Sequence, residues 1–361
     1  MKRNKFIVLF LLYPVSKIYG LVTSVRNWLF DKKIIKSEEF DIPIVSVGNL
    51  AVGGTGKTPH VEYIVDRFRS RYNIAILSRG YRRQTKGFVL AAAKTSPWDI
   101  GDEPYQMFHK FGGEVRVAVC EKRKEGIKKL REIDPKINLI VLDDAFQHRY
   151  VKPKVSILLM EYNRPAYEDY MLPLGRLRES ARSVNRAEMV IITKCPAQMS
   201  PLKFRLFKNN LNLFPWQKLF FSEYEYDAIQ PAFPEVSKET PDLNSLTATD
   251  SLIALSGIAN PRTFNRYVKS FNTKVKTLHF PDHHVYERED FDLIEERFSK
   301  MSGRKYIITS EKDAVRLSSS PYFPHKLKPY LFYVPIKVRF KDYETGSFDA
   351  QLEILIKEVA L

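Results

Sequence analysis

The sequence predicts an α/β protein with a mainly parallel sheet domain and a second, smaller α/β domain. Short apolar segments rich in β-branched residues alternate with helical stretches, as in folds with a parallel sheet. These segments are apolar almost throughout, which is typical of strands covered on both faces. The length of 361 residues corresponds to about two domains of ordinary size. Strands of the first domain are expected over 42–47, 74–77, 115–119, 139–142, 155–160 and 189–193.

The composition restricts the class of protein. Apolar residues make up 44% of the chain, which excludes a wholly disordered protein. The formal net charge of +16 attracts anions such as phosphate, nucleic acid or an acidic membrane surface. Cys120 and Cys195 are the only cysteines, so a four-cysteine zinc site is excluded, and this usage suits a reducing compartment.

Residues 1–36 form a strongly basic segment with eight basic side chains and one acidic one. Its apolar run over 6–15 is shorter than the ~20 residues that span a bilayer. A secretory signal has a similar layout, but no small-residue cleavage site follows. Apolar residues continue at helical spacing instead, at Ile18, Leu21, Val22, Val25 and Leu29. We expect an amphipathic helix that lies in an anionic membrane interface or packs as an ordinary helix on the domain behind it.

The next feature is a phosphate-binding motif between the strand expected over 42–47 and a helix expected over 60–69. A strand before and a helix after are the context that a P-loop requires. Lys57 would reach the β- and γ-phosphates and Thr58 would bind Mg²⁺. The motif, with Ala in place of the usual first Gly, consists of Ala51, Val52, Gly53, Gly54, Thr55, Gly56, Lys57 and Thr58. It predicts a P-loop NTPase-like domain.

ATP is the expected nucleotide. GTPases carry Asn-Lys-x-Asp at the end of a later strand, and the corresponding segment here, over 193–196, reads Thr-Lys-Cys-Pro and lacks the Asp.

Two adjacent carboxylates, Asp143 and Asp144, follow the strand expected over 139–142. They would repel each other at the end of a buried strand unless a cation lies there. In a P-loop protein an acid at this place holds Mg²⁺. The alternative is a pair of exposed turn residues.

Two segments could supply a base for an alcohol acceptor. Asp102 lies in Gly-Asp-Glu-Pro, and His283 follows Asp282 after a strand of the second domain. A His held by a carboxylate can accept a hydroxyl proton near neutral pH. Other interpretations stay open, because Asp102 before Glu103 and Pro104 suits a helix N-cap, and His283 could be a loop residue or a metal ligand.

We expect four regions along the chain. Residues 1–36 form the basic helix, 37–215 the P-loop domain, 216–250 a linker rich in Pro and aromatic residues, and 251–361 the smaller domain.

The ordered set of motifs resembles the tetraacyldisaccharide 4'-kinase family of lipid A biosynthesis. The motifs are GNLAVGGTGKTP (48–59), SRGYRR (78–83), GDEP (101–104), LDDAFQH (142–148), LPLGRLRES (172–180), SGIANP (256–261), FPDHHVY (280–286) and TSEKDAVRL (309–317). A P-loop alone is common, but this ordered set is specific and covers nearly the whole chain.

The resemblance implies a kinase that uses ATP and Mg²⁺ and phosphorylates the 4'-hydroxyl of a tetraacylated glucosamine disaccharide 1-phosphate. It implies a peripheral or monotopic protein at the cytoplasmic face of the bacterial inner membrane, with an acylated disaccharide phosphate lipid and an anionic membrane surface as partners. It also implies that Asp102 and His283 form a catalytic pair and that Asp143 and Asp144 lie near the metal. Arg123, Arg178 and Glu179 match further charged active-site positions.

Arg82 and Ser180 depart from the pattern, since many members have Gly and Pro there. Arg82 could alter contacts with phosphate or with the lipid headgroup.

Two other classes compete with a lipid kinase. A nucleic-acid-dependent P-loop ATPase would use the positive charge, but the sequence carries no aromatic RNA-binding motif and the charge gathers at the N-terminus, so no nucleic-acid partner is expected. A nucleotide-gated membrane adaptor would bind ATP and lipid without transferring phosphate. The Asp-His-His triplet is also similar to that of a class of phosphoesterases, whose other metal-binding motifs are not apparent.

Overall fold

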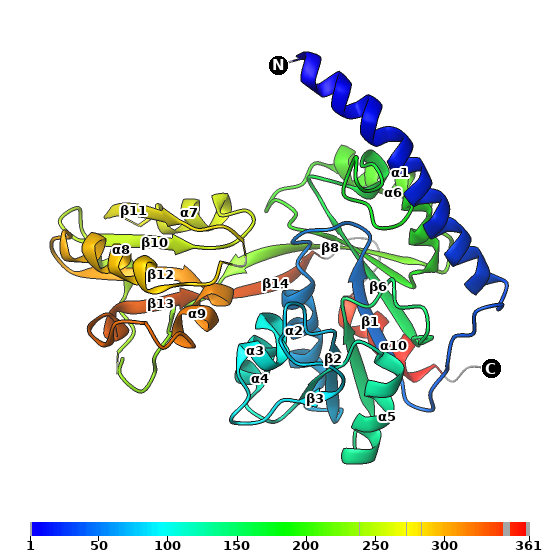
Figure 1. Ribbon diagram of the computed structural model, residues 1–361, viewed down its shortest axis with the longest axis horizontal. Coiled ribbons are helices and arrows are strands. Elements are labelled where there is room, and N and C mark those ends of the chain that lie inside the picture. Colours follow the sequence, from blue (N-terminus) through cyan, green and yellow to red (C-terminus); the bar gives the residue numbers. More distant parts are fainter. Residues whose placement is uncertain (1, 238, 272, 283, 342–346, 359–361) are drawn as a thin grey trace.

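The chain folds into two α/β units, each built on its own sheet (Figure 1). The computed structural model describes residues 2–237, 239–271, 273–282, 284–341 and 347–358. Within this part of the chain the first sheet has nine strands in the order β14-β8-β7-β6-β1-β5-β2-β4-β3. The seven strands from β8 to β4 run parallel, and β14 and β3 pair antiparallel at the two edges. The predicted α/β class with a mainly parallel sheet is confirmed.

The strands of the first sheet fall on the predicted segments and add three that were not predicted. Their bounds are β1 Ile44–Asn49, β2 Ile74–Ser78, β3 Val89–Leu90, β4 Arg116–Val119, β5 Leu139–Asp143, β6 Val155–Glu161, β7 Met189–Thr193, β8 Lys218–Tyr226 and β14 Ile336–Lys341. The helices of this unit are α1 Lys2–Asp31, α2 Lys57–Phe68, α3 Pro97–Ile100, α4 Asp102–Phe111, α5 Arg123–Ile133, α6 Pro201–Leu211 and α10 Phe348–Lys357.

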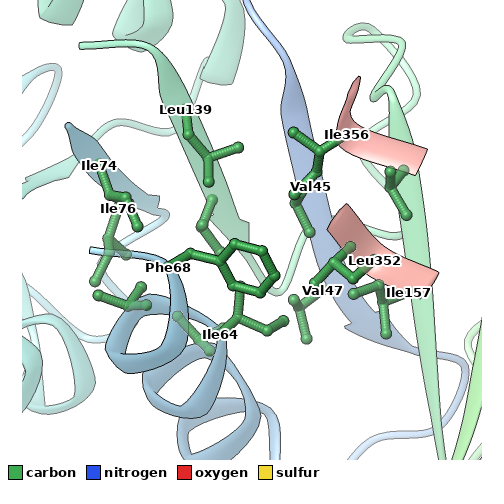
Figure 2. Close-up of a cluster of buried hydrophobic side chains, with 14 of the residues drawn as sticks. Val45, Val47, Ile64, Phe68, Ile74, Ile76, Leu139, Ile157, Leu352 and Ile356 are labelled. Atoms are coloured by element: carbon green, nitrogen blue, oxygen red, sulfur yellow. The ribbon is translucent and has the colours of Figure 1, made fainter. Parts of the chain in front are cut away.

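Helices cover both faces of the first sheet, which is why its strands are apolar throughout. On one face α2, α4 and α10 pack on the sheet, and Figure 2 shows Ile64 and Phe68 of α2 and Leu352 of α10 beside strand residues such as Val47. On the other face α5 and α6 bury Leu130 and Phe207 against the sheet.

In the residues of the second unit that the structure describes, five strands form a sheet in the order β11-β10-β12-β13-β9, with only β9 antiparallel. Helices α8 and α9 cover one face and α7 the other. The bounds are β9 Gln230–Pro231, β10 Ser251–Ser256, α7 Arg262–Val268, β11 Lys274–His279, α8 Arg288–Ser299, β12 Lys305–Ser310, α9 Glu311–Ser318 and β13 Leu331–Val334.

The expected boundaries of the second unit differ from this arrangement. β8 lies inside the segment expected as a linker over 216–250, yet it pairs with β7 of the first sheet. β14 and α10 lie inside 251–361, yet they also belong to the first sheet and its core. The second unit is therefore an insertion between β8 and β14, and Figure 1 shows these two strands reaching toward it. The physical reason is long-range pairing, since β8 and β14 lie more than a hundred positions apart and neither carries a local signal of its partner.

The basic N-terminal segment forms the helix α1, as predicted. One side of α1 faces the first unit: the hydroxyl of Ser16 donates to the carbonyl of Met171 at 2.8 Å, and that of Tyr19 to Arg178 at 3.2 Å. The side chains of Leu11, Val15, Ile18, Val22 and Val25, spaced alternately four and three apart, are exposed. Among the described residues, no helix is both long and apolar enough to cross a membrane.

Leu352→Ala tests whether α10 belongs to the core of the first unit. Leu352 is fully buried, so truncating it should lower the free energy of unfolding by about 2–5 kcal/mol, as measured by urea denaturation. Ile354, on the same helix and 49% exposed, is the matched control, and its change to Ala should cost less than about 1 kcal/mol. Equal costs for the two variants would contradict the packing.

Candidate active site

The phosphate-loop motif lies between the carboxyl end of β1 and the first turn of α2. Gly53 and Gly56 have φ angles of 113° and 91°, which glycine adopts without strain. A side chain at Gly56 would also collide with the hydroxyl of Tyr224, because its Cβ would lie 1.6 Å from that oxygen. A Cβ at Gly54 would meet no atom within 4 Å. β8 therefore shapes the loop at Gly56, whereas the loop is open at Gly54.

Thr55, in the middle of the loop, is buried and held from two sides. The amide of Asn49 donates to its hydroxyl at 2.6 Å, and the hydroxyl of Thr193 donates to its carbonyl oxygen at 2.9 Å. Lys194 contacts the carbonyl of Gly54 and lies 3.1 Å from Glu161. Strands β1 and β7 thus each send a side chain to the loop, and Glu161 of β6 holds Lys194, which also contacts it; together these contacts fix the conformation of the loop.

Asp143 is buried at the carboxyl end of β5. The hydroxyl of Ser78 donates to its Oδ2 at 3.1 Å, and Oδ1 has no hydrogen-bond partner among the residues that the structure describes. Burial raises the pKa of Asp143 to about 6, and the charge of Asp144 adds to this effect. Glu103 acts in the same direction, which places the start of α4 within electrostatic range of this carboxylate.

Asp144 carries the ion pairs of the site. Its carboxylate lies 3.6 Å from Nζ of Lys57 and 2.9 Å from Nη2 of Arg178. Burial alone would raise the pKa of Asp144, but Lys57 and Arg178 outweigh burial and hold the pKa below its usual value. Asp144 is therefore ionised at neutral pH, and its position fixes the P-loop lysine beside the end of β5.

This arrangement fits a magnesium ion. A buried carboxylate oxygen without a partner favours a cation, and Asp143 presents one close to the phosphate loop. Among the described residues, no group of three or more His, Cys, Asp or Glu side chains could hold a metal by itself. That suits Mg²⁺, which usually takes one or two carboxylates together with waters and phosphate oxygens.

Arg123 is buried beside the carboxyl end of β5. Its buried guanidinium donates to the carbonyl oxygens of Cys120 at 2.8 Å and of Asp143 at 3.3 Å. Burial lowers the pKa of Arg123 to about 10, so the group stays charged at neutral pH. Arg123 therefore ties the end of β4 to the end of β5 and supports the position of Asp143.

Arg178 and Glu179 are neighbours in the chain with different surroundings. Arg178 contacts Asp144 and the side chain of Asn49, so it belongs to the site. Glu179 is buried 2.6 Å from Arg186 and 3.9 Å from Arg26 of α1. Glu179 thus joins the N-terminal helix to the loop before β7.

Asp102 is the first residue of α4, and the alternative interpretation of the sequence was that it caps this helix. Gly101 is the N-cap residue instead, and the carboxylate of Asp102 accepts hydrogen bonds from Arg316 of the second unit, from Nε at 2.8 Å and Nη2 at 2.7 Å. His283 lies outside the described residues. Its neighbour Asp282 is 3.9 Å from Lys312, which is also 3.0 Å from Glu103.

Lys312 therefore brings the segment that carries His283 close to the start of α4. The second histidine of the triplet, His284, is bound through Nε2 to Asp290 at 2.7 Å.

Among the residues that contact the site, Tyr224, Ser78 and Arg316 were not singled out from the sequence. Tyr224 lies in a segment expected as a linker, whereas Ser78 and Arg316 lie in the motifs SRGYRR and TSEKDAVRL, in which neither was given a role. The sequence holds no local signal for Tyr224, but Ser78 and Arg316 could have been singled out from those motifs.

Fold and site together define a P-loop nucleotide-binding protein. The family model for Tetraacyldisaccharide-1-P 4'-kinase matches residues 8–357. The tetraacyldisaccharide 4'-kinase of Bacteroides thetaiotaomicron is 44% identical over 355 residues, 96% of this chain and 93% of the relative. That of Flavobacterium johnsoniae is 42% identical over 96% of this chain and 97% of the relative. The chain belongs to the tetraacyldisaccharide-1-phosphate 4'-kinase family.

A solved structure agrees with this assignment. LpxK from Aquifex aeolicus, crystallised in complex with ATP, matches with a TM-score of 0.69 and 27% identity over 99% of this chain and 98% of that one.

Asp143→Asn should stabilise the protein in the absence of nucleotide and magnesium. The folded-state pKa near 6 lies above the ordinary value of 3.8, so the wild type loses stability as the pH rises from about 4 to about 6. At pH 7.5 the variant should gain up to about 3 kcal/mol, and at pH 4 the difference should vanish. Thermal unfolding at both pH values measures this.

Asp144→Asn is the matched control of opposite sign. The pKa of Asp144 is lowered in the folded state, so its contribution is present above the ordinary value and is lost as the pH falls. This variant should be less stable than wild type at pH 7.5. Equal shifts for the two variants would contradict the different surroundings assigned to them.

Proposed function

We propose that this chain is a lipid-sugar kinase that transfers the γ-phosphoryl group of ATP to the 4'-hydroxyl of a tetraacylated glucosamine disaccharide 1-phosphate. The family match over residues 8–357 supports this reaction. The observation that carries it is the meeting of three features at one place: the phosphate loop, the carboxylates of Asp143 and Asp144, and the start of α4, where Asp102 precedes Glu103, a residue within electrostatic range of Asp143.

On the nucleotide side, the open stretch of the loop at Gly54 would receive the phosphates. Lys57, held by Asp144, would neutralise charge on the transferring group. Asp143, together with Thr58 at the start of α2, would hold magnesium, which when bound screens the negative charge of the phosphates. Hydrogen bonds and ion pairs fix the loop and Lys57, which would keep reorganisation during the reaction small.

On the acceptor side, we assign His283 as the base for the proton of the sugar hydroxyl and Asp102 as its partner. Two observations support this assignment. Lys312 links Glu103, next to Asp102, with Asp282, next to His283. The carboxylate of Asp102 is also fixed by Arg316 rather than used as a helix cap.

The helix α1 would hold the enzyme on an anionic membrane surface at the cytoplasmic side of the inner membrane. Its exposed apolar stripe is formed by side chains other than Ser16 and Tyr19, which contact the first unit. Basic residues flank this stripe, which suits a helix that lies in the interface beside acidic lipid headgroups. An acylated substrate would be met at that surface.

Lys57→Ala tests the reaction. Transfer of ³²P from γ-labelled ATP to the purified lipid disaccharide 1-phosphate should fall by ~10²–10³-fold or more, because the transferring group loses its main positive partner from the protein. Lys152, an exposed lysine paired with Glu39, is the control, and its change to Ala should leave turnover unchanged. Near-normal transfer by Lys57→Ala would reject the assignment of the phosphate loop.

The triple variant Ile18→Ser, Val22→Ser, Val25→Ser tests the membrane surface without disturbing the contacts of α1 with the first unit. Cosedimentation with vesicles containing anionic phospholipids should fall several-fold, because apolar burial and charge act together in such binding. Ile133→Ser, at another exposed apolar position, should bind as wild type does. Unchanged binding of the triple variant would show that the membrane contact lies elsewhere.

A further inference from the structure

Two motifs of the second unit, SGIANP and TSEKDAVRL, meet around one buried carboxylate. Asp313, on α9, is fully buried, with 0% of its surface exposed. Its Oδ2 accepts hydrogen bonds from the hydroxyl of Ser310 at 2.6 Å and from the backbone N–H of Gly257 at 2.9 Å. The hydroxyl of Ser310 in turn accepts from the backbone N–H of Asp313 at 3.1 Å, which caps α9. Asp313 is thus immobilised by groups of its own unit.

Asp313 in turn holds Arg316, one turn further along α9. Nη1 of Arg316 lies 3.3 Å from Oδ1 of Asp313 and 3.4 Å from the carbonyl oxygen of Gly257. The side chain of Arg316 is only 8% exposed. Its remaining donors, Nε and Nη2, point to the first unit and bind Oδ2 of Asp102 at 2.8 and 2.7 Å.

We propose that Arg316, held by Asp313 and Gly257, is the positioning residue for Asp102, so that this carboxylate is set for catalysis only when α9 of the second unit lies against α4. The proposal rests on the role of Asp102 in the proposed function. A guanidinium is planar and offers donors in a fixed geometry, so a guanidinium held on one side fixes the carboxylate bound to its other side.

The segment that carries His283 reaches the same network. Tyr286, the last residue of FPDHHVY, is buried beside Asp313: a Cβ at Gly257 would lie 3.0 Å from Oδ1 of Asp313 and 3.2 Å from the Tyr286 hydroxyl. Burial raises the pKa of Tyr286 and the charge of Asp313 raises it further. The end of the FPDHHVY segment thus lies beside Asp313, the same carboxylate that holds the arginine bound to the start of α4.

A merely structural ion pair at the interface is the competing explanation. The same two helices also meet through Lys110 and Glu311 at 3.3 Å and through Lys312 and Glu103 at 3.0 Å. These pairs contribute to seating α9 on α4 without Arg316. The Arg316 pair differs from these two pairs in its partners. Arg316 binds Asp102, and it is also held by the fully buried carboxylate of Asp313. An ion pair that only joined the two helix surfaces would not need this second, buried partner.

Steady-state kinetics of the full chain, with ATP and the lipid disaccharide 1-phosphate, test the proposal. Arg316→Gln should lower kcat by ~10–100-fold, less than the ~10²–10⁴-fold that a whole acid–base step contributes, and leave KM for ATP within about twofold of wild type. Arg316→Lys should restore part of kcat, because lysine keeps the positive charge but lacks the planar set of donors of a guanidinium. Lys326→Gln, which removes an exposed cation paired with Glu295 in the same unit, should behave as wild type.

The double variant Asp102→Asn, Arg316→Gln separates positioning from structure. If Arg316 acts through Asp102, the double variant should be no slower than Asp102→Asn alone. Losses that multiply, or a raised KM for ATP with kcat unchanged, would overturn the proposal.

If Arg316→Gln does not fold, Ser310→Ala, which removes one hydrogen bond from Asp313, should lower kcat with KM for ATP unchanged, and wild-type kcat there would count against the proposal. Failure of the proposed function is distinguishable, because the wild type would then transfer no phosphate to the lipid.

Discussion

A buried carboxylate with one oxygen that no described residue hydrogen-bonds is the constraint around which the site is built, and Asp143 is that group. β5 lies between β1 and β2, so the neighbouring strands bring the phosphate loop and Ser78 to the same edge of the sheet. Lys57 and Arg178 are paired with Asp144, so one oxygen of Asp143 remains to bind a metal cation. Keeping the Asp143 carboxylate buried and ionised lowers the stability of the folded state, and ligand binding to the folded state offsets this loss.

The strands and the phosphate loop could be predicted because their signals are local. The six strands predicted in the first domain all form, since helices cover both faces of the sheet and each strand is apolar along its length. The loop motif places its chemistry within eight consecutive positions, and Asp143 and Asp144 follow directly after a buried strand. In such segments a short window of sequence contains the whole physical cause of the structure.

The remainder depends on contacts between distant segments. β8 and β14 alternate buried and exposed residues weakly and pair with each other from opposite ends of the inserted unit, so neither predicts the other. The place of Tyr224 over Gly56 follows from that pairing. Arg316 appears in the sequence as one basic residue among many, and only the meeting of α9 with α4 brings it to Asp102. The role of His283 stays a prediction.

The division of the site between two units has a physical consequence for the reaction. The groups around Asp143 are fixed by burial within one sheet, whereas Asp102 is held by an ion pair that exists only when α9 lies against α4. The contacts between these helices are charged, and interfaces of this kind between domains separate at low cost because water solvates both surfaces. With Asp102 and His283 acting as proposed, nucleotide binding would not by itself complete the acceptor side. A water molecule beside the phosphates would then meet no positioned base until the two surfaces join, which would favour transfer to the sugar over hydrolysis.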